Sequence, residues 1–364
     1  MAYPKHIGVL TGGGDCPGLN AVIRAVVKDA LYHGIRVTGI EDGFLGLIER
    51  RARPLDDHAV SDILTAGGTV LGSSNKANPQ QFATGMNEDG TVIWEDVTPQ
   101  CVDYMKHLGL EALVVIGGDG TMTCAAPMIE AGINCIGVPK TIDNDLHGTD
   151  ITFGFMTAVH IATESMDRVR TTAASHHRVM VVEVMGRNSG WIALHSGVAS
   201  GADVILLPEI EFDVDKICES IRERQRRGKK YSIVCVAEGA KPKGGEQIVH
   251  RVDPTSPDPI RLGGIADWLM HKIEDATKIE SRHVVLGHTQ RGGTPVAADR
   301  VLATQFGHHA MELLKDNAEG RMVAMQGFKL TDIPILECAG KQRLVPGDHH
   351  LVAAARSVAT SFGD

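Results

Sequence analysis

Residues 6–18 have the sequence HIGVLTGGGDCPG, and this stretch decides the fold class. Residues 6–10 form a short apolar run, typical of a buried strand, and a glycine-rich turn follows them. From Leu19 onward, apolar residues recur at helical spacing until Gly34, which has the position of a C-terminal helix cap. A second apolar run at 36–40 completes a unit of strand, helix and strand. Because such units build parallel sheets covered by helices, the sequence predicts an α/β fold.

The same unit recurs through most of the chain. Residues 112–116 are again a short apolar run, and the turn GGDGT follows them. By the same criteria we expect further strands at 135–138, 179–184, 204–207, 231–237 and 283–287, and helices at 122–131, 155–172 and 191–199. Residues 241–260, rich in Lys, Gly, Asp and Pro, predict an exposed loop.

Length and charge limit the possible classes of function. A chain of 364 residues with 43% apolar composition is long enough for two domains. The net charge is -9 and the 36 basic residues are dispersed, which argues against nucleic-acid or membrane partners. No apolar run has the length of a membrane span or a signal peptide, so we expect a soluble, cytoplasmic protein. The seven cysteines lie far apart without a CxxC pair, which predicts reduced thiols and no zinc site.

The two glycine turns, TGGGD and GGDGT, follow strands and precede helices. At the carboxyl ends of parallel strands, exposed backbone N–H groups and helix N-termini bind anions. Neither turn has the GxGxxG or GxxxxGK[ST] spacing, so dinucleotide binding and P-loop chemistry are disfavoured. A tight structural turn is the alternative interpretation of either one alone. Because each turn carries an acid, Asp15 or Asp119, the pair favours binding of phosphate and metal.

The segment PKTIDND, residues 139–145, follows the predicted strand at 135–138. Its two carboxylates, Asp143 and Asp145, are flanked by hydroxyl, amide and ammonium groups. One of them can act as a general base toward a substrate hydroxyl, with Asp119 holding magnesium on the donor phosphates. An Asx turn is the structural alternative, since Asn-Asp sequences commonly form one.

Cationic side chains recur at strand ends and loop starts, where they suit recognition of a phosphate dianion. They are Arg178, Arg187, Arg282, His288 and Arg291. For any one arginine taken alone, a solvated surface position is the alternative.

Five motifs together resemble the motif set of the 6-phosphofructokinases, in its bacterial type with mixed ATP- and pyrophosphate-dependent features: TGGGDCPGLNAVIR, GGDGT, PKTIDNDLHGTD, VVEVMGRNSG and LGHTQRGGTP. The resemblance implies a glycolytic kinase that phosphorylates the 1-hydroxyl of fructose 6-phosphate with Mg-ATP. It also implies two Rossmann-like three-layer lobes with mainly parallel sheets, the active site between them, and a homodimer or homotetramer. We expect the donor-binding lobe at 1–154 and 290–340, and the fructose 6-phosphate-binding lobe at 155–289 and 341–364. No function is assigned to the residues after about Gly340.

Site residues follow from the motifs by resemblance. Asp143 resembles the base that deprotonates the sugar hydroxyl, with Thr141 and Asp145 beside it, and Arg187 the residue that stabilises the transferring phosphoryl group. By the same resemblance, Met185, Gly186 and Glu238 are expected to contact the sugar. The 6-phosphate is expected to be held by a cluster of Arg178, Arg282, His288 and Arg291. Of these, Arg178 and Arg282 resemble residues that family members contribute across a subunit interface.

On the donor side, the resemblance implies phosphate-binding turns and a magnesium ligand, Asp119. The donor contacts are Gly14, Asn75, Lys76, Gly118, Asp119, Gly120 and Thr121. Asn75 and Lys76 replace an arginine that is common in the family.

Two positions bear on the choice of donor. Gly120 resembles ATP users, because a missing side chain leaves room for a nucleoside, whereas Lys140 resembles pyrophosphate users. We expect ATP, with a pyrophosphate-dependent phosphotransferase as the alternative. A non-catalytic metabolite-binding subunit and a dehydrogenase are further alternatives, which the intact acids and the missing dinucleotide spacing disfavour.

Overall fold

The computed structural model describes residues 3–253 and 259–364, and its larger sheet has eight strands. Seven of these strands have the order β16-β15-β7-β6-β1-β2-β3, and β8 pairs with β7. They are β1 (His6–Thr11), β2 (Arg36–Ile40), β3 (Ala52–Pro54), β6 (Ala112–Gly117), β7 (Asn134–Thr141), β8 (Phe153–Gly154), β15 (Arg321–Gln326) and β16 (Lys329–Pro334). The central pairs are parallel, and only the outer strands β3 and β16 pair in antiparallel fashion. The strands predicted at 6–10, 36–40, 112–116 and 135–138 are therefore confirmed.

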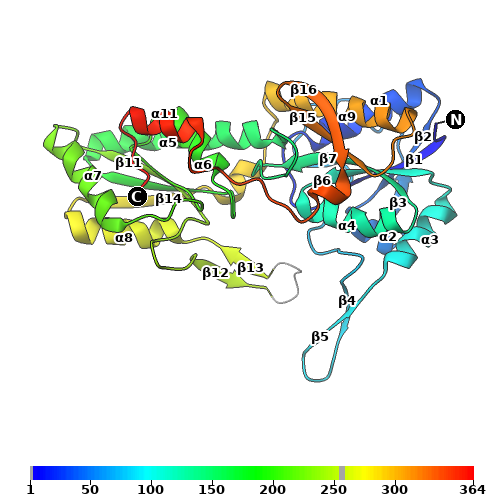
Figure 1. Cartoon of the computed structure of the whole chain (residues 1–364), viewed down its shortest axis with the longest axis horizontal. Helices are drawn as coiled ribbons and strands as arrows, with labels where there is room; N and C mark the ends of the chain where they lie inside the picture. The colour runs from blue at the N-terminus through cyan, green and yellow to red at the C-terminus, as the bar shows by residue number, and fades with distance from the viewer. Residues whose placement is uncertain (1–2, 254–258) are drawn as a thin grey trace.

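Helices cover both faces of this sheet, which makes three layers (Figure 1). They are α1 (Leu19–Tyr32), α2 (Phe44–Ile48), α3 (Thr98–Leu108), α4 (Asp119–Glu130) and α9 (Ala297–Lys315). Consecutive side chains of β1 point to opposite faces of the sheet. Val9 packs in the core under α1 and α9, whereas Leu10 packs in the core under α2, α3 and α4. Helix α4 begins at Asp119 and not at Met122, so GGDGT includes the first turn of that helix.

The smaller sheet is fully parallel, with the order β10-β11-β9-β14. Its strands are β9 (Val179–Val184), β10 (Val204–Leu206), β11 (Ser232–Ala237) and β14 (Ser281–Val285). One face packs on α5 (Phe155–His176) and α6 (Trp191–Ser200), and the other on α7 (Val214–Arg226) and α8 (Ile265–Thr277) (Figure 1). The α/β class with mainly parallel sheets is thus confirmed, while the predicted domain boundaries stay a prediction.

Several elements were not predicted. Two antiparallel hairpins extend on the same side of the molecule (Figure 1), β4 (Phe82–Met86) with β5 (Val92–Glu95), and β12 (Val249–Val252) with β13 (Ile260–Leu262). The prediction of an exposed loop at 241–260 is therefore wrong where β12 and β13 pair. Residues 254–258 of that range lie outside the described residues. The C-terminal part adds α10 (Ile335–Cys338) and α11 (His350–Ser357). Among the described residues, no helix is both long and apolar enough to cross a membrane.

Candidate active site

A cleft of about 510 Å³ lies at the carboxyl ends of β1, β6 and β7. Both predicted glycine turns and the PKTIDND segment line it, as does Arg187 from the loop after β9. The predicted site residues in its lining are Gly14, Asn75, Gly118, Asp119, Gly120, Thr121, Lys140, Thr141, Asp143, Asp145, Arg187 and Arg291. Segments far apart in the sequence therefore meet at one cleft.

The glycines of the two turns allow close packing around Thr121. A Cβ atom at Gly117 would lie 2.2 Å from the Cβ of Thr121, and a Cβ at Gly12 would lie 2.7 Å from its hydroxyl oxygen. Gly120 differs, because apart from its chain neighbours and the backbone of its own helix, no atom of the described residues lies within 4 Å of the position its Cβ would take. The first turn of α4 therefore presents open space to the cleft at Gly120.

The two carboxylates of PKTIDND lie just after β7. Between them, Asn144 has a left-handed backbone with φ of 52°, and its side-chain oxygen accepts a hydrogen bond from the backbone N–H of Thr152 at 2.9 Å. This bond spans eight residues and is therefore not the local Asx turn given as the alternative, and both carboxylates line the cleft. The Oδ1 atom of Asp143 is buried and has no hydrogen-bond partner among the described residues.

Burial raises the pKa of both carboxylates. For Asp143, the cations Arg291, Lys140 and Arg187 oppose the effect of burial. For Asp145, burial and then the neighbouring Asp143 raise the pKa to about 7. A carboxylate with a raised pKa and an unpartnered oxygen is suited to accept a proton from a bound hydroxyl.

Arg187 belongs to the loop after β9 and has a strained backbone conformation. Its φ is 50°, and its backbone N–H donates to Oε1 of Glu238 at 3.1 Å. Burial and Asp143 raise the pKa of Glu238 to about 7. The loop packs closely against Gly239, because a Cβ atom at that position would lie 1.8 Å from the carbonyl oxygen of Arg187. From the same loop, the Ser189 hydroxyl donates to the carbonyl oxygen of Asp143 at 3.0 Å.

Two more cations lie beside the TGGGD turn. The ammonium of Lys140 donates to the carbonyl oxygen of Gly14, and Arg291 donates to the carbonyl oxygen of Asp15 at 3.2 Å. Lys140 is 3% exposed, and burial lowers its pKa. Together with Arg187, these side chains give the cleft positive charge suited to phosphate groups.

The carboxylates of the cleft also suit a magnesium ion. Asp119 begins α4, burial raises its pKa, and its Oδ1 atom accepts the backbone N–H of Gly340 at 2.6 Å. Mg²⁺ prefers hard oxygen ligands, usually one or two carboxylates together with substrate phosphates. The oxygen donor set therefore fits the predicted metal, with Asp119 as the protein ligand.

Other predicted residues lie outside the lining of the cleft. Arg178 and Arg282 both pair with Glu280, at 2.7 and 2.5 Å, and His288 is exposed on the 3₁₀ helix at Gly287–Arg291. Within this chain, therefore, the structure brings only Arg291 of the predicted 6-phosphate cluster to the cleft.

Four further residues predicted to contact the substrates do not line the cleft. Met185, Gly186 and Glu238 adjoin Arg187 without lining the cleft. Lys76 forms an ion pair with Asp253 of the β12–β13 hairpin at 3.1 Å, whereas its neighbour Asn75 lines the cleft.

Sequence reasoning missed several polar residues of the cleft, which are Ser74, Asn78, Thr123, Asn188 and Gln342. Gln342 lines the cleft and donates from its side-chain amide to Oδ2 of Asp145 at 3.2 Å. It follows α10, in a part of the chain without a recognised motif, so no sequence signal marked it.

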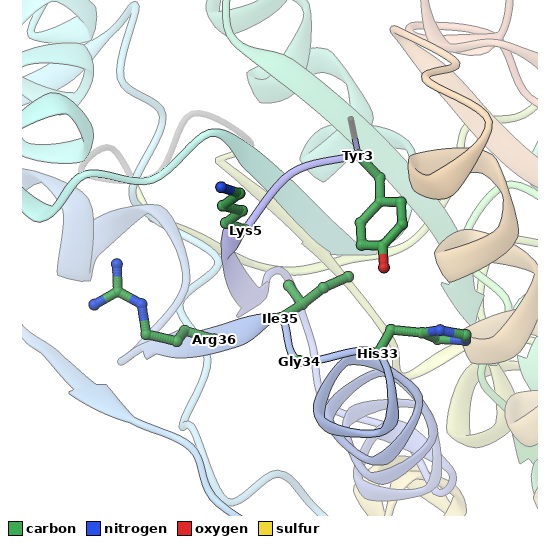
Figure 2. A pocket seen from close by; sticks show the side chains of 6 residues that line it. All are labelled: Tyr3, Lys5, His33, Gly34, Ile35 and Arg36. Carbon is green, nitrogen blue, oxygen red and sulfur yellow. The ribbon is translucent and has the colours of Figure 1, made fainter. Parts of the chain in front are cut away.

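A second hollow, of about 580 Å³, lies near the N-terminus and is lined by Tyr3, Lys5, His33, Gly34, Ile35 and Arg36 (Figure 2). Lys5 precedes β1 and Arg36 begins β2, so this hollow is at the amino ends of the strands. Parallel sheets hold ligands at the carboxyl ends of their strands, and among the described residues no carboxylate lines this hollow. The cleft with Asp143 is therefore the candidate active site.

Comparison with known proteins identifies the family. The phosphofructokinase family model matches residues 6–314. An ATP-dependent 6-phosphofructokinase 2 of Clostridium perfringens is 52% identical over 362 residues, which cover 99% of both chains. A pyrophosphate–fructose 6-phosphate 1-phosphotransferase of Amycolatopsis methanolica is 48% identical over 347 residues, covering 95% of this chain and 97% of the relative.

The fold agrees with a solved phosphofructokinase of Pichia pastoris in the T-state. The TM-score is 0.79 with 29% identity, and the match covers 100% of this chain and 40% of the solved chain. This chain thus spans about two fifths of the length of that structure. The extent of the family match and the identity to full-length relatives bear out the resemblance of the five motifs, and the chain belongs to the phosphofructokinase family.

Proposed function

We propose that this protein is an ATP-dependent 6-phosphofructokinase, which converts fructose 6-phosphate and Mg-ATP into fructose 1,6-bisphosphate and ADP in glycolysis. One observation carries the assignment of the chemistry. The buried Oδ1 of Asp143 has no hydrogen-bond partner among the described residues and lies in a cleft with Arg187, Lys140 and Arg291. The names of the full-length relatives support the substrate and the donor.

In this mechanism Asp143 accepts the proton of the sugar 1-hydroxyl. The hydroxyl oxygen then forms a bond to the γ-phosphorus, and the bond from that phosphorus to the β,γ-bridging oxygen breaks to release ADP. Arg187 stabilises the negative charge on the phosphoryl group in transit. Thr141 keeps the loop of Asp143 in place, because its hydroxyl accepts the backbone N–H of Asp143 at 3.1 Å.

The donor phosphates bind along the two glycine turns. Gly118, Thr121 and Gly14 offer backbone groups there, and Asn75 offers a side-chain amide. Mg²⁺ held by Asp119 neutralises the charge of the donor phosphates when it is bound. Lys140 adds a positive charge next to Gly14.

For the 6-phosphate of the sugar, we propose binding by Arg291 and His288 together with Arg178 and Arg282 of a second copy of the chain. The pairs that Arg178 and Arg282 form with Glu280 place both arginines away from the cleft of their own chain. A homodimer or homotetramer would complete the site, with Met185, Gly186 and Glu238 near the sugar ring. The cytoplasm is the proposed location.

Pyrophosphate is the second candidate donor. Lys140 is buried beside the TGGGD turn, and the relative of Amycolatopsis methanolica is named for pyrophosphate. ATP is the better donor on steric grounds, because the open space at Gly120 admits a third phosphate and a nucleoside.

The test is the formation of fructose 1,6-bisphosphate with ATP and pyrophosphate supplied in separate reactions, each with and without magnesium. We expect turnover with Mg-ATP and none after removal of the metal. Turnover with pyrophosphate but not with ATP would refute the assignment of ATP as the donor. Absence of product with both donors would refute the kinase function.

A further inference from the structure

The cleft receives a group of contacts from the C-terminal part of the chain. We call residues 339–349 the strap. It leaves α10, which packs against α4 beside the larger sheet, and enters α11, which contacts α6 beside the smaller sheet (Figure 1). Gln342, in the first half of the strap, lines the cleft.

The first half of the strap bonds to two acids of the cleft. The backbone N–H of Gly340 donates to Oδ1 of Asp119 at 2.6 Å. Two residues later, the side-chain amide of Gln342 donates to Oδ2 of Asp145 at 3.2 Å, and the backbone N–H of Arg343 donates to the carbonyl oxygen of Asp145 at 2.7 Å. The strap therefore contacts both the side chain and the backbone of Asp145.

The middle of the strap, at Arg343 and Val345, is anchored near the loop of Arg187. The guanidinium of Arg343 lies 4.1 Å from the centre of the Trp191 ring, and the indole N–H of Trp191 donates to the carbonyl oxygen of Arg343 at 2.9 Å. Further along, the backbone N–H of Val345 donates to Oε1 of Glu209 at 2.8 Å, an oxygen that also accepts the N–H of Gly190 at 3.0 Å.

We propose that Gln342 is a positioning residue for phosphoryl transfer, which holds the carboxylate of Asp145 in the orientation that the cleft requires. This inference rests on the proposed kinase function. Asp145 is 9% exposed, and its carboxylate adjoins Asp143, so an alternative rotamer would move negative charge relative to the base. The amide hydrogen bond from Gln342, whose neighbour Arg343 accepts a hydrogen bond from Trp191, restricts that movement.

The strap offers a matched set of variants. Gln342→Ala removes the amide, and Gln342→Glu keeps the size of the side chain but cannot donate to an ionised carboxylate. Lys341→Ala is the control, because Lys341 is exposed like its neighbour Gln342 but does not line the cleft. Asp145→Asn, alone and combined with Gln342→Ala, completes a double-mutant cycle that isolates the contact between the two residues.

Initial rates with Mg-ATP and fructose 6-phosphate test the proposal, with thermal melting to monitor the fold. We expect Gln342→Ala and Gln342→Glu each to lower kcat about 10-fold, as for loss of a hydrogen bond to a charged group, with the KM for fructose 6-phosphate changed less than about twofold. In the Asp145→Asn background, Gln342→Ala should lower kcat by less than about twofold.

Three results would overturn the inference alone while the unmodified enzyme is active. They are a Gln342→Ala variant as active as Lys341→Ala, a Gln342→Glu variant with unmodified kcat, and an equal effect of Gln342→Ala with and without the Asp145 carboxylate. Absence of turnover in the unmodified enzyme would refute the proposed function, and this inference with it.

Discussion

The ammonium group of Lys76 lies 3.1 Å from the carboxylate of Asp253, so an ion pair connects the segment after β3 with the β12–β13 hairpin. The side chain of Asp253 is only 13% exposed, and Arg251 approaches it as well, at 3.9 Å. The motif comparison had assigned Lys76 to the donor phosphates. In the structure, the adjacent Asn75 lines the cleft and Lys76 reaches toward the hairpin.

From this pair we predict different effects for the two neighbours. Asn75→Ala should raise the KM for ATP about fivefold, as expected for the loss of a neutral hydrogen bond, whereas Lys76→Ala should change it less than about twofold. Steady-state kinetics would measure both, with Asp253→Asn as the control for the ion pair itself. A larger increase in the KM for ATP with Lys76→Ala than with Asn75→Ala would show that Lys76 contacts the donor.

Replacing Asp143 should abolish most turnover while leaving the fold intact. We expect Asp143→Ser to lower kcat by about 10²- to 10⁴-fold, the usual contribution of a general base, and to retain binding of fructose 6-phosphate. Kinetics and titration calorimetry would measure the two effects. Asp348→Ser, which removes an exposed carboxylate of the strap, is the control. Turnover near that of the unmodified enzyme would show that Asp143 is not the base.

The open space at Gly120 predicts a change of donor preference. Gly120→Asp places a carboxylate in the space that is open beside Gly120 among the described residues, and it should lower kcat/KM for ATP at least about tenfold more than kcat/KM for pyrophosphate. Gly120→Ala adds a methyl group without charge and should have a small effect with either donor. Equal losses with both donors would refute the steric explanation.

The raised pKa of Glu238 predicts how the stability of the unliganded protein depends on pH. Its pKa rises from 4.5 to about 7 on folding, so the folded protein binds more protons than the unfolded chain between these values. The contribution of Glu238 to the free energy of unfolding therefore falls as the pH rises from about 4.5 to 7, by about 3 kcal/mol at most.

Glu238→Gln removes this titration and should stabilise the protein at pH 8 relative to pH 5. Urea unfolding at both pH values would measure the difference between the variant and the unmodified protein. Glu319→Gln, at an exposed position, is the matched control and should leave the pH dependence unchanged. A Glu238→Gln variant with the pH dependence of the unmodified protein would contradict the prediction.

Local patterns in the amino-acid sequence were sufficient to predict the α/β class and the strands that carry the cleft. The apolar run of β1, the glycines after it and the helical spacing from Leu19 are short-range features, and each dictates its own element. The placement of TGGGD, GGDGT and PKTIDND at one edge follows as well, because parallel strands end on the same side of a sheet.

Only the tertiary structure decided which partners the polar side chains have. Lys76 pairs with Asp253 and Gln342 with Asp145, although each pair is separated by more than a hundred residues, and Arg178 and Arg282 share Glu280 outside the cleft. Periodicity records which face of an element is buried, but hydrogen bonds and ion pairs depend on atoms that approach within about 3 Å. These short distances arise only when folding places the strap beside Asp145 and the β12–β13 hairpin beside Lys76.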